Sequence, residues 1–184
     1  KRHNAFRYRL LPFLDELGAQ PDYYIEAGSL GLYYRNSLTA FKDVDGGFLK
    51  PDTENYEHWR DKLKALGAGL KVGICWRSGL RTAERNIWYP QLKYWEGILK
   101  TQGCRFINLQ YGDCADELAY FKEAFGIDVY DPEDINLKDD LDACAALTKA
   151  CDIVVSIGAA PAMMAYGVNT PIIWMFPYAP WWSF

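Results

Sequence analysis

The stretch DIVVSIGAAPAMMAYGVNTPIIWMF, residues 152–176, decides the fold. It opens with a nearly continuous apolar run over 152–158, which is typical of a strand buried on both faces of a sheet. Small residues follow, and Pro161 suits the first turn of a short helix over 160–167. A second apolar run over 170–176 predicts another strand, so the stretch forms one strand–helix–strand unit.

The same alternation extends from this unit towards the N-terminus. The runs KVGICWR, CRFINLQY and IDVYD predict strands over residues 71–77, 104–111 and 127–131. Helices are predicted between the strands over 89–103, 113–126 and 139–151. About five strands that alternate with helices predict an α/β fold, a Rossmann-like doubly wound parallel sheet with helices on both faces.

Capping residues place the ends of several predicted helices. Asp113 is the expected N-cap of the helix over 113–126, and Gly126 is its expected stop. Asn136 or Asp139 is expected to open the helix over 139–151. Gly67 is the expected C-cap of one further helix over 53–67.

The first fifty residues have a different character. A helix is predicted over 6–18, whereas the aromatic segment 22–41 has turn signals and is expected to be loop-like. We expect a domain boundary or linker near 43–52. Since the chain begins with Lys1 and ends in an aromatic tail over 174–184, we expect it to be a fragment of a longer protein.

Composition excludes several classes of protein. Half of the 184 residues are hydrophobic, 24% are charged and the formal net charge is −4. Such a chain can bury a core, and it is a poor candidate for binding nucleic-acid phosphates. The longest apolar stretch, over 153–168, is broken by Gly158, Pro161 and Gly167, so no transmembrane segment is expected.

The five cysteines form no CxxC pair, and the chain has only two histidines. Buried free thiols in a reducing cytoplasm are therefore the preferred interpretation, and no metal site is expected.

The predicted fold places the loops after its strands at one edge, where open α/β sheets bind ligands. After the strand over 152–158, Gly158, Ala159 and Ala160 lead into a helix N-terminus, an arrangement that suits a phosphate. These small residues could equally serve only close packing of helix and strand. Arg77 could grip a phosphate with two hydrogen bonds, or it could pair with a carboxylate.

Two other groups of residues leave alternatives open. Gln110 and Tyr111 could contact a nucleobase or could simply pack their loop. The acidic run of Asp139, Asp140 and Asp142 favours a helix N-terminus over metal binding. The aromatic tail, including Trp174, Trp181 and Trp182, could stack on a sugar or could belong to the core or to a docking surface.

Three blocks, KVGICWRSG, RFINLQYGD and residues 140–176, together resemble the C-terminal half of GT-B glycosyltransferases. The resemblance is to bacterial heptosyltransferase-like proteins and to O-GlcNAc-transferase-like proteins associated with tetratricopeptide repeats. It implies that residues 51–184 form a nucleotide-sugar-binding Rossmann-like domain that is truncated at its C-terminus. Residues 1–50 would be the tail end of an acceptor-side domain plus a linker.

The resemblance also implies roles for individual residues. Arg77 and Ser78 would contact the donor diphosphate, and Gln110 and Tyr111 would lie beside the nucleoside. The phosphates would receive backbone N–H groups from Gly158, Ala159 and Ala160. Transfer would need no metal and no cofactor, and the catalytic base would lie before the start of this chain.

This chain departs from the family pattern at the predicted phosphate loop. Relatives usually carry Thr or Ser hydroxyls there and often a histidine early in the next helix, whereas this chain has Ala159, Ala160 and Met163. Some relatives also hold the ribose with an acidic residue in that helix, and residues 160–167 contain none.

The expected function is therefore that of a cytoplasmic bacterial glycosyltransferase. Its partners would be a nucleotide-sugar donor and a glycan, lipid-linked or protein acceptor, without nucleic acid and with peripheral membrane association left open. Two alternatives stay open. One is a non-catalytic module that binds a glycan or a protein through a decayed site, and the other is a nucleotide-sugar epimerase.

Overall fold

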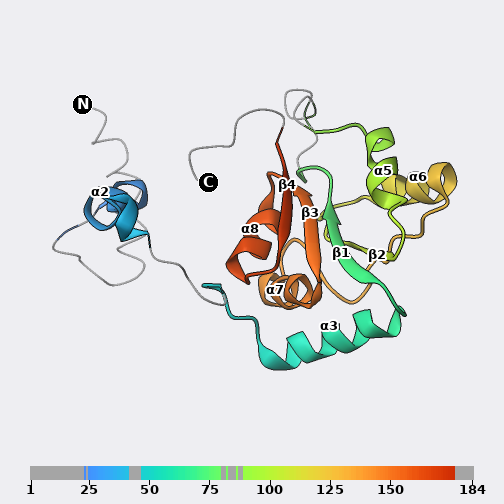
Figure 1. Ribbon diagram of the computed structural model, residues 1–184, viewed down its shortest axis with the longest axis horizontal. Coiled ribbons are helices and arrows are strands. Elements are labelled where there is room, and N and C mark those ends of the chain that lie inside the picture. Colours follow the sequence, from blue (N-terminus) through green and yellow to red (C-terminus); the bar gives the residue numbers. More distant parts are fainter. Residues whose placement is uncertain are drawn as a thin grey trace. The chain divides into compact units, whose positions relative to one another are not determined.

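A computed structural model describes residues 23, 25–41, 47–79, 82, 86 and 89–176 (Figure 1). The chain divides into two compact units, Lys1–Asp43 and Val44–Phe184. The second unit contains the sheet and all the predicted site residues. No helix in the described ranges is long and apolar enough to cross a membrane.

The second unit is built on a four-stranded parallel sheet with the order β2-β1-β3-β4. Its strands are β1 (Leu70–Cys75), β2 (Cys104–Asn108), β3 (Ile153–Ile157) and β4 (Ile172–Met175). The strand order reverses at β1, which pairs with β2 on one side and with β3 on the other. This confirms the predicted α/β, Rossmann-like fold and places the switch point between β1 and β3.

The strand predicted over 127–131 is reduced to a single parallel bridge between Ile107 and Tyr130. The N–H of Tyr130 donates to the Phe106 carbonyl (2.9 Å), and the Asn108 N–H donates to the Tyr130 carbonyl (2.8 Å). Pro132 follows and has no N–H, so the ladder cannot continue past this point. The prediction of five strands was therefore one too many.

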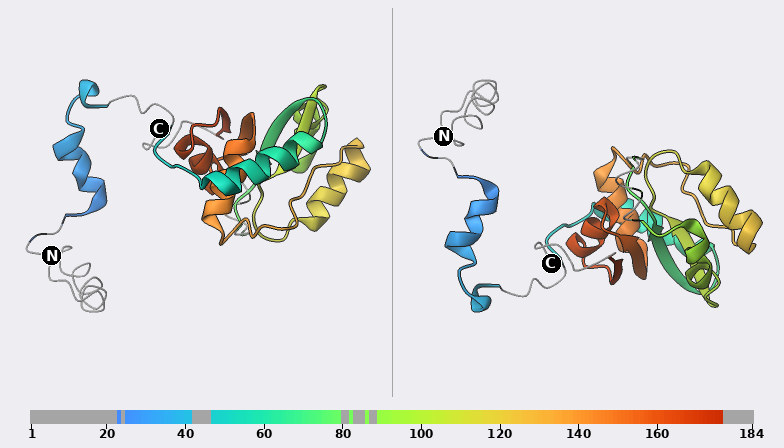
Figure 2. Two further views of the ribbon diagram at one scale, coloured as in Figure 1. Left: turned by 90° about the horizontal axis from the view of Figure 1, so that it is seen from below. Right: turned by 90° about the horizontal axis from the view of Figure 1, so that it is seen from above.

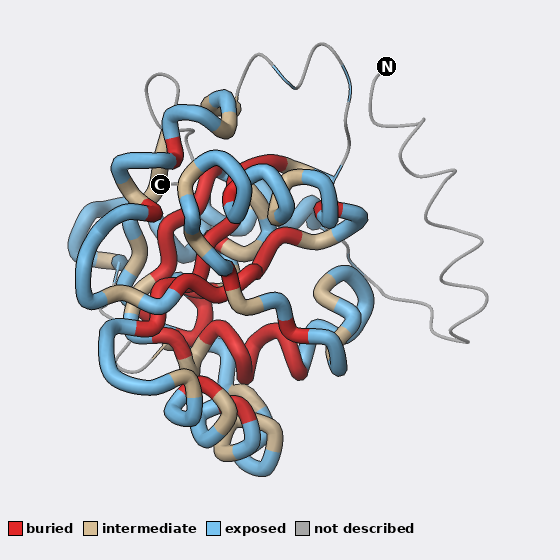
Figure 3. Tube along the Cα trace, turned by 90° about the vertical axis from the view of Figure 1, so that its right-hand side faces the viewer, coloured by how far each residue is buried: buried red, intermediate tan, exposed pale blue. Residues whose placement is uncertain are grey.

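Helices cover both faces of the sheet (Figure 2). On one face α5 (Glu96–Leu99) and α6 (Ala115–Phe125) pack over a core that includes Trp76, Trp95 and Phe121. On the other face lie α3 (Thr53–Ala65), α7 (Leu141–Ala150) and α8 (Ala160–Gly167). Buried residues concentrate in the strands and in α7 (Figure 3).

The helix ends partly follow the predictions. Gly126 ends α6 at φ +70°, and Gly67 follows α3 at φ +89°, as expected for glycine after a helix. The N-caps were predicted wrongly, because Cys114 and not Asp113 precedes α6. Asp140 caps α7 by accepting from the Ala143 N–H at 3.0 Å.

The helix predicted over 89–103 is much shorter than expected. It consists of the 3-10 turn η3 (Leu92–Trp95) followed by α5. Gln91 is extended, with ψ 148°, and it delays the start of the helix. Gly103, at φ +76°, turns the chain into β2 and limits the helix at its other end.

The first unit contains short helices where a loop was expected. They are η1 (Ala27–Ser29), α2 (Leu30–Tyr34) and η2 (Leu38–Ala40). None of the three contains a buried residue. The helix predicted over 6–18 lies outside the described residues.

Candidate functional site

The loops after β2 and β3 come together beside α7 and α8, at the edge where the switch-point rule places ligands. A cavity of about 150 Å³ lies there, with a lining that is mostly apolar. Its walls are Leu109, Tyr111, Leu137, Lys138, Leu141, Cys144, Thr148, Ala160, Pro161 and Met164. Two of the residues predicted from sequence, Tyr111 and Ala160, therefore line one cavity.

Tyr111 forms part of the cavity wall, and its ring packs on Gly79. A Cβ at Gly79 would lie 2.6 Å from Cε2 of that ring, closer than two carbon atoms can approach. Gly79 therefore lets the ring come this close to the loop after β1. Tyr111 is half-buried, so one part of its side chain remains accessible from the cavity.

Gln110 points into the protein and away from the cavity. It is 1% exposed, and its Oε1 accepts from the N–H groups of Trp76 (3.2 Å) and Arg77 (3.0 Å). Its Nε2 donates to the Tyr111 carbonyl at 3.1 Å. These contacts match the alternative in which Gln110 packs its loop.

Arg77 is buried, with 6% exposure, and is paired with Glu117. Its Nε donates to Oε1 of Glu117 at 2.7 Å, and its Nη2 donates to Oε2 at 2.6 Å. Nη2 also donates to the Asp113 carbonyl (2.7 Å), and Nη1 donates to the Ser78 carbonyl (3.2 Å). The guanidinium thus has the carboxylate partner that was the alternative to a phosphate grip.

The electrostatic environment of Arg77 stabilises its charge. Burial alone would lower the pKa of Arg77, but the hydrogen bonds and the negative charge of Glu117 more than offset that effect. The pKa of Arg77 consequently lies above its ordinary value. Sequence reasoning missed Glu117, which sits in the first turn of α6 and resembles any acidic residue that favours a helix N-terminus.

The loop that leads into α8 offers fewer donors than predicted. The Ala159 N–H donates to the Ile157 carbonyl at 2.8 Å, and Pro161 has no N–H. Ala160, the first residue of α8, lines the cavity. A Cβ at Gly158 would meet nothing closer than 3.7 Å, so close packing does not require glycine there.

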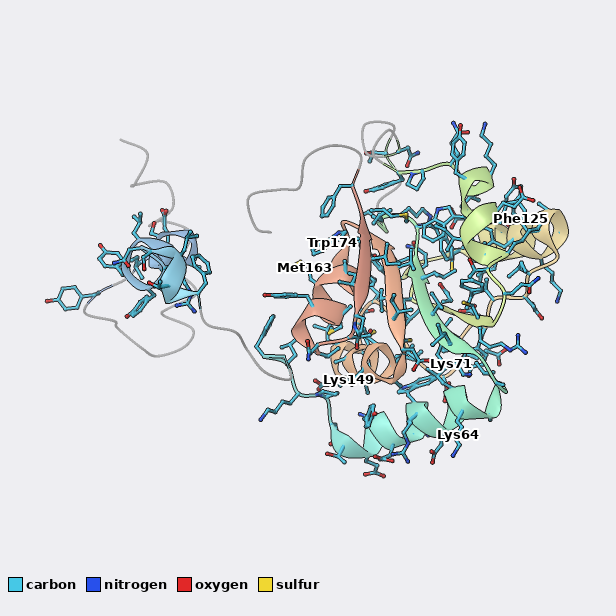
Figure 4. All side chains as sticks on the ribbon, viewed as in Figure 1. Lys64, Lys71, Phe125, Lys149, Met163 and Trp174 are labelled. Carbon is cyan, nitrogen blue, oxygen red and sulfur yellow. The ribbon has the colours of Figure 1, made fainter. Side chains whose placement is uncertain are left out.

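The remaining predicted residues take other positions. Ser78 is half-buried at the end of β1, where its carbonyl accepts from Arg77. Asp140 caps α7, which matches the helix-terminal role expected for the acidic run. Trp174 stacks on Phe176 with ring centroids 5.0 Å apart, whereas Trp181 and Trp182 lie outside the described residues. Met163 points outward from α8 and is 45% exposed (Figure 4).

All five cysteines are unpaired, as predicted. Cys144 lies in the cavity wall, and its Sγ donates to the Leu137 carbonyl at 3.3 Å. Burial raises the pKa of the Cys144 thiol to about 11, and the charge of Asp140 adds to the shift. This thiol is therefore protonated at neutral pH and is a poor nucleophile.

Comparisons with known proteins show what the sequence and the fold resemble. No protein-family model matches the sequence. The chain is 37% identical over 174 residues to Protein FlbA of Caulobacter vibrioides, a match that covers 95% of this chain and 29% of FlbA. The chain thus spans less than a third of that relative, whose name states no activity.

A solved glycosyl transferase family 9 protein from Veillonella parvula superposes with a TM-score of 0.60. The superposition covers 88% of this chain and 47% of that one, at 12% sequence identity. At such low identity the likeness concerns the fold alone. The chain therefore has a glycosyltransferase-like, Rossmann-like fold.

Proposed function

We propose that this chain is the donor-binding part of a glycosyltransferase. It binds a nucleotide-diphosphate sugar, and the sugar is transferred to a hydroxyl group of a glycan, lipid-linked or protein acceptor. The observation that carries this proposal is the apolar cavity at the carboxyl ends of the strands, walled by Tyr111 and by the first turn of α8.

The cavity, at about 150 Å³, has room for the base of such a donor. The Tyr111 ring provides a flat surface on which a base can stack, and the leucines around it exclude water. Lys138 lines the same cavity and brings a positive charge to this edge. The diphosphate extends towards Ala160, where the partial positive charge of the α8 N-terminus favours an anion.

In this proposal the acceptor oxygen attacks the anomeric carbon, the bond from that carbon to the diphosphate breaks, and a base removes the acceptor proton. That base belongs to the acceptor-side domain, of which residues 1–50 are the tail end. Residues 51–184 bind the donor. The finer assignment is to cytoplasmic bacterial heptosyltransferase-like or tetratricopeptide-associated enzymes. Transfer needs neither a cofactor nor a metal, so EDTA should leave the activity of the full-length protein unchanged.

Calorimetric titration with UDP, GDP, ADP and CMP tests the proposal. One nucleotide should bind selectively, and Tyr111→Ala should weaken its binding about tenfold, the scale of losing one stacked base. Tyr94→Ala is the matched control, because Tyr94 is 66% exposed and lines no described cavity. Equal affinities for all four nucleotides, or no effect of Tyr111→Ala, would contradict this assignment of the cavity.

A non-catalytic module is the second candidate, favoured by the absence of hydroxyl groups at Ala159 and Ala160 and by the pairing of Arg77 with Glu117. A product assay on the full-length protein separates the candidates. A transferase releases nucleoside diphosphate only when an acceptor is present. An epimerase changes the donor without an acceptor, and a binding module does neither.

A further inference from the structure

A buried polar cluster is hydrogen-bonded to the segment that carries Tyr111, the tyrosine of the cavity wall. Its members are Arg77, Asn108, Gln110 and Glu117, which come from the ends of β1 and β2 and from α6. Asn108 and Gln110 are each 1% exposed, and the Glu117 side chain is 14% exposed. None of the four lines the cavity that holds Tyr111.

Three hydrogen bonds of this cluster reach backbone groups at or beside Tyr111. Asn108 Oδ1 accepts from the Gln110 N–H at 2.7 Å, and Gln110 Nε2 donates to the Tyr111 carbonyl at 3.1 Å. Arg77 Nη2 donates to the Asp113 carbonyl at 2.7 Å. The segment that carries the Tyr111 ring is therefore held at three backbone positions.

The cluster ties the same segment to the end of β1. Gln110 Oε1 accepts from the N–H groups of both Trp76 and Arg77. Gly79, on which the Tyr111 ring lies, follows only two residues later. The side chain of Gln110 thus fixes the two loops to each other, and the hydrogen bond from Arg77 to the Asp113 carbonyl does the same.

Glu117 completes the arrangement by holding the guanidinium of Arg77 in place. Its two carboxylate oxygens occupy Nε and Nη2, which leaves Arg77 oriented towards the Asp113 carbonyl. A buried guanidinium without its carboxylate partner is strongly unfavourable, so loss of Glu117 should displace Arg77 and release the loop.

We propose that Arg77, Gln110 and Glu117 are positioning residues that hold the Tyr111 segment in the shape that binds the nucleoside. This inference rests on the proposed function, and it replaces a direct contact of Arg77 with the diphosphate. The two roles predict opposite effects of substituting Glu117 on ligand affinity. The Glu117 carboxylate does not itself bind a phosphate, because like charges repel.

The decisive experiment compares a nucleoside with its diphosphate, using the base selected in the titration above. If Arg77 is a positioning residue, Glu117→Gln should weaken binding of both ligands by the same factor, about tenfold, which corresponds to losing a charged hydrogen bond. If Arg77 grips the diphosphate, Glu117→Gln should release the guanidinium. Diphosphate binding would then be unchanged or tighter, and this outcome would overturn the proposal.

The matched control is Glu123→Gln, the same chemical change at an exposed position on the same helix. It should leave both affinities unchanged. All titrations are made well below the melting temperature, where a role confined to stability would not alter the affinity of the folded chain. Where Glu117→Gln fails to fold, Gln110→Met removes the neutral hydrogen bonds and should weaken both ligands equally.

Amide hydrogen exchange on the ligand-free protein gives a readout that does not depend on nucleotide binding. Glu117→Gln and Gln110→Met should each speed exchange at Trp76 and Arg77 by about tenfold or more, while Val154 in β3 stays protected. Unchanged exchange at both positions refutes the positioning role. If the wild-type chain binds no nucleotide, the proposed function fails, and the exchange rates still decide the role of the cluster.

Discussion

At the scale of single residues, the position of the Tyr111 ring in the cavity wall depends on the absence of a side chain at Gly79. Tyr111 packs where any larger residue at position 79 would place its Cβ. Gly79 does not have a positive φ, so the backbone itself would accept alanine. Its importance lies in the space that it leaves for the tyrosine ring.

Gly79→Ala should therefore push the Tyr111 ring from its position and weaken nucleotide binding several-fold. The free energy of unfolding should change by less than about 1 kcal/mol, since the site is at the surface. Titration and chemical unfolding measure the two effects. Gly97→Ala is the control, because no atom lies within 4 Å of the added Cβ in α5, and it should alter neither the affinity nor the fold. Unchanged affinity in Gly79→Ala would show that the ring can move without cost.

At the scale of elements, the sheet and α7 meet around the buried thiol of Cys151. This residue follows α7 directly and is 5% exposed, and its Sγ would lie 3.2 Å from a Cβ at Gly73 of β1. The atom nearest to such a Cβ is Leu109 Cδ1, at 2.5 Å, so glycine at position 73 leaves room chiefly for Leu109 and also for Cys151 in the α7–β3 connection. Lys71 strengthens the same region, because its Nζ donates to the carbonyls of Gly67 (2.6 Å) and Gly69 (2.8 Å) after α3.

Burial raises the pKa of Cys151 to about 12 from an ordinary 9.0, and the charge of Asp152 adds to the shift. The folded state thus keeps a proton that the unfolded state loses, so stability is lost as pH rises from about 9 towards 12. One such thiol contributes a slope of about 1.4 kcal/mol per pH unit in that window. Urea unfolding between pH 8 and 10.5 should give a smaller slope for Cys151→Ala than for the wild type. Parallel slopes would contradict the shift.

At the scale of the whole molecule, the second unit carries its own core. The buried members of both core clusters lie between Trp59 and Ala165. The segment just before them docks on the end of α8, where the Leu49 N–H donates to the Gly167 carbonyl at 2.8 Å. Phe48 meets Tyr166 edge-on, with ring centroids 5.9 Å apart.

Removal of residues 1–43 should therefore leave the melting temperature of the second unit within about 3 °C, a shift that corresponds to about 1 kcal/mol for a unit of this size. Removal of residues 1–50 should lower it further, because the contacts of Phe48 and Leu49 with the end of α8 are lost. Calorimetry on both truncated chains makes the comparison. A large loss from the shorter deletion would mean that the first unit contributes to the core.

Much of the fold could be predicted because its causes are local. The apolar runs of β1, β2, β3 and β4 and the glycine stops at Gly67 and Gly126 depend on neighbouring residues in sequence. The strand expected over 127–131 is reduced to one bridge, and Pro132 cannot extend it because proline has no N–H to donate to the neighbouring strand. The apolar pattern that predicted this strand contains no information about hydrogen-bond donors.

The sequence alone determined the α/β class, the order of strands and helices, and the edge where Tyr111 and Ala160 lie. Only the tertiary structure decided which side chains at that edge face the cavity. Arg77 and Gln110 turn inward because Glu117 and the backbone of a neighbouring loop supply their partners. Those partners are 40 and 33 residues away along the chain, so no local pattern could reveal them.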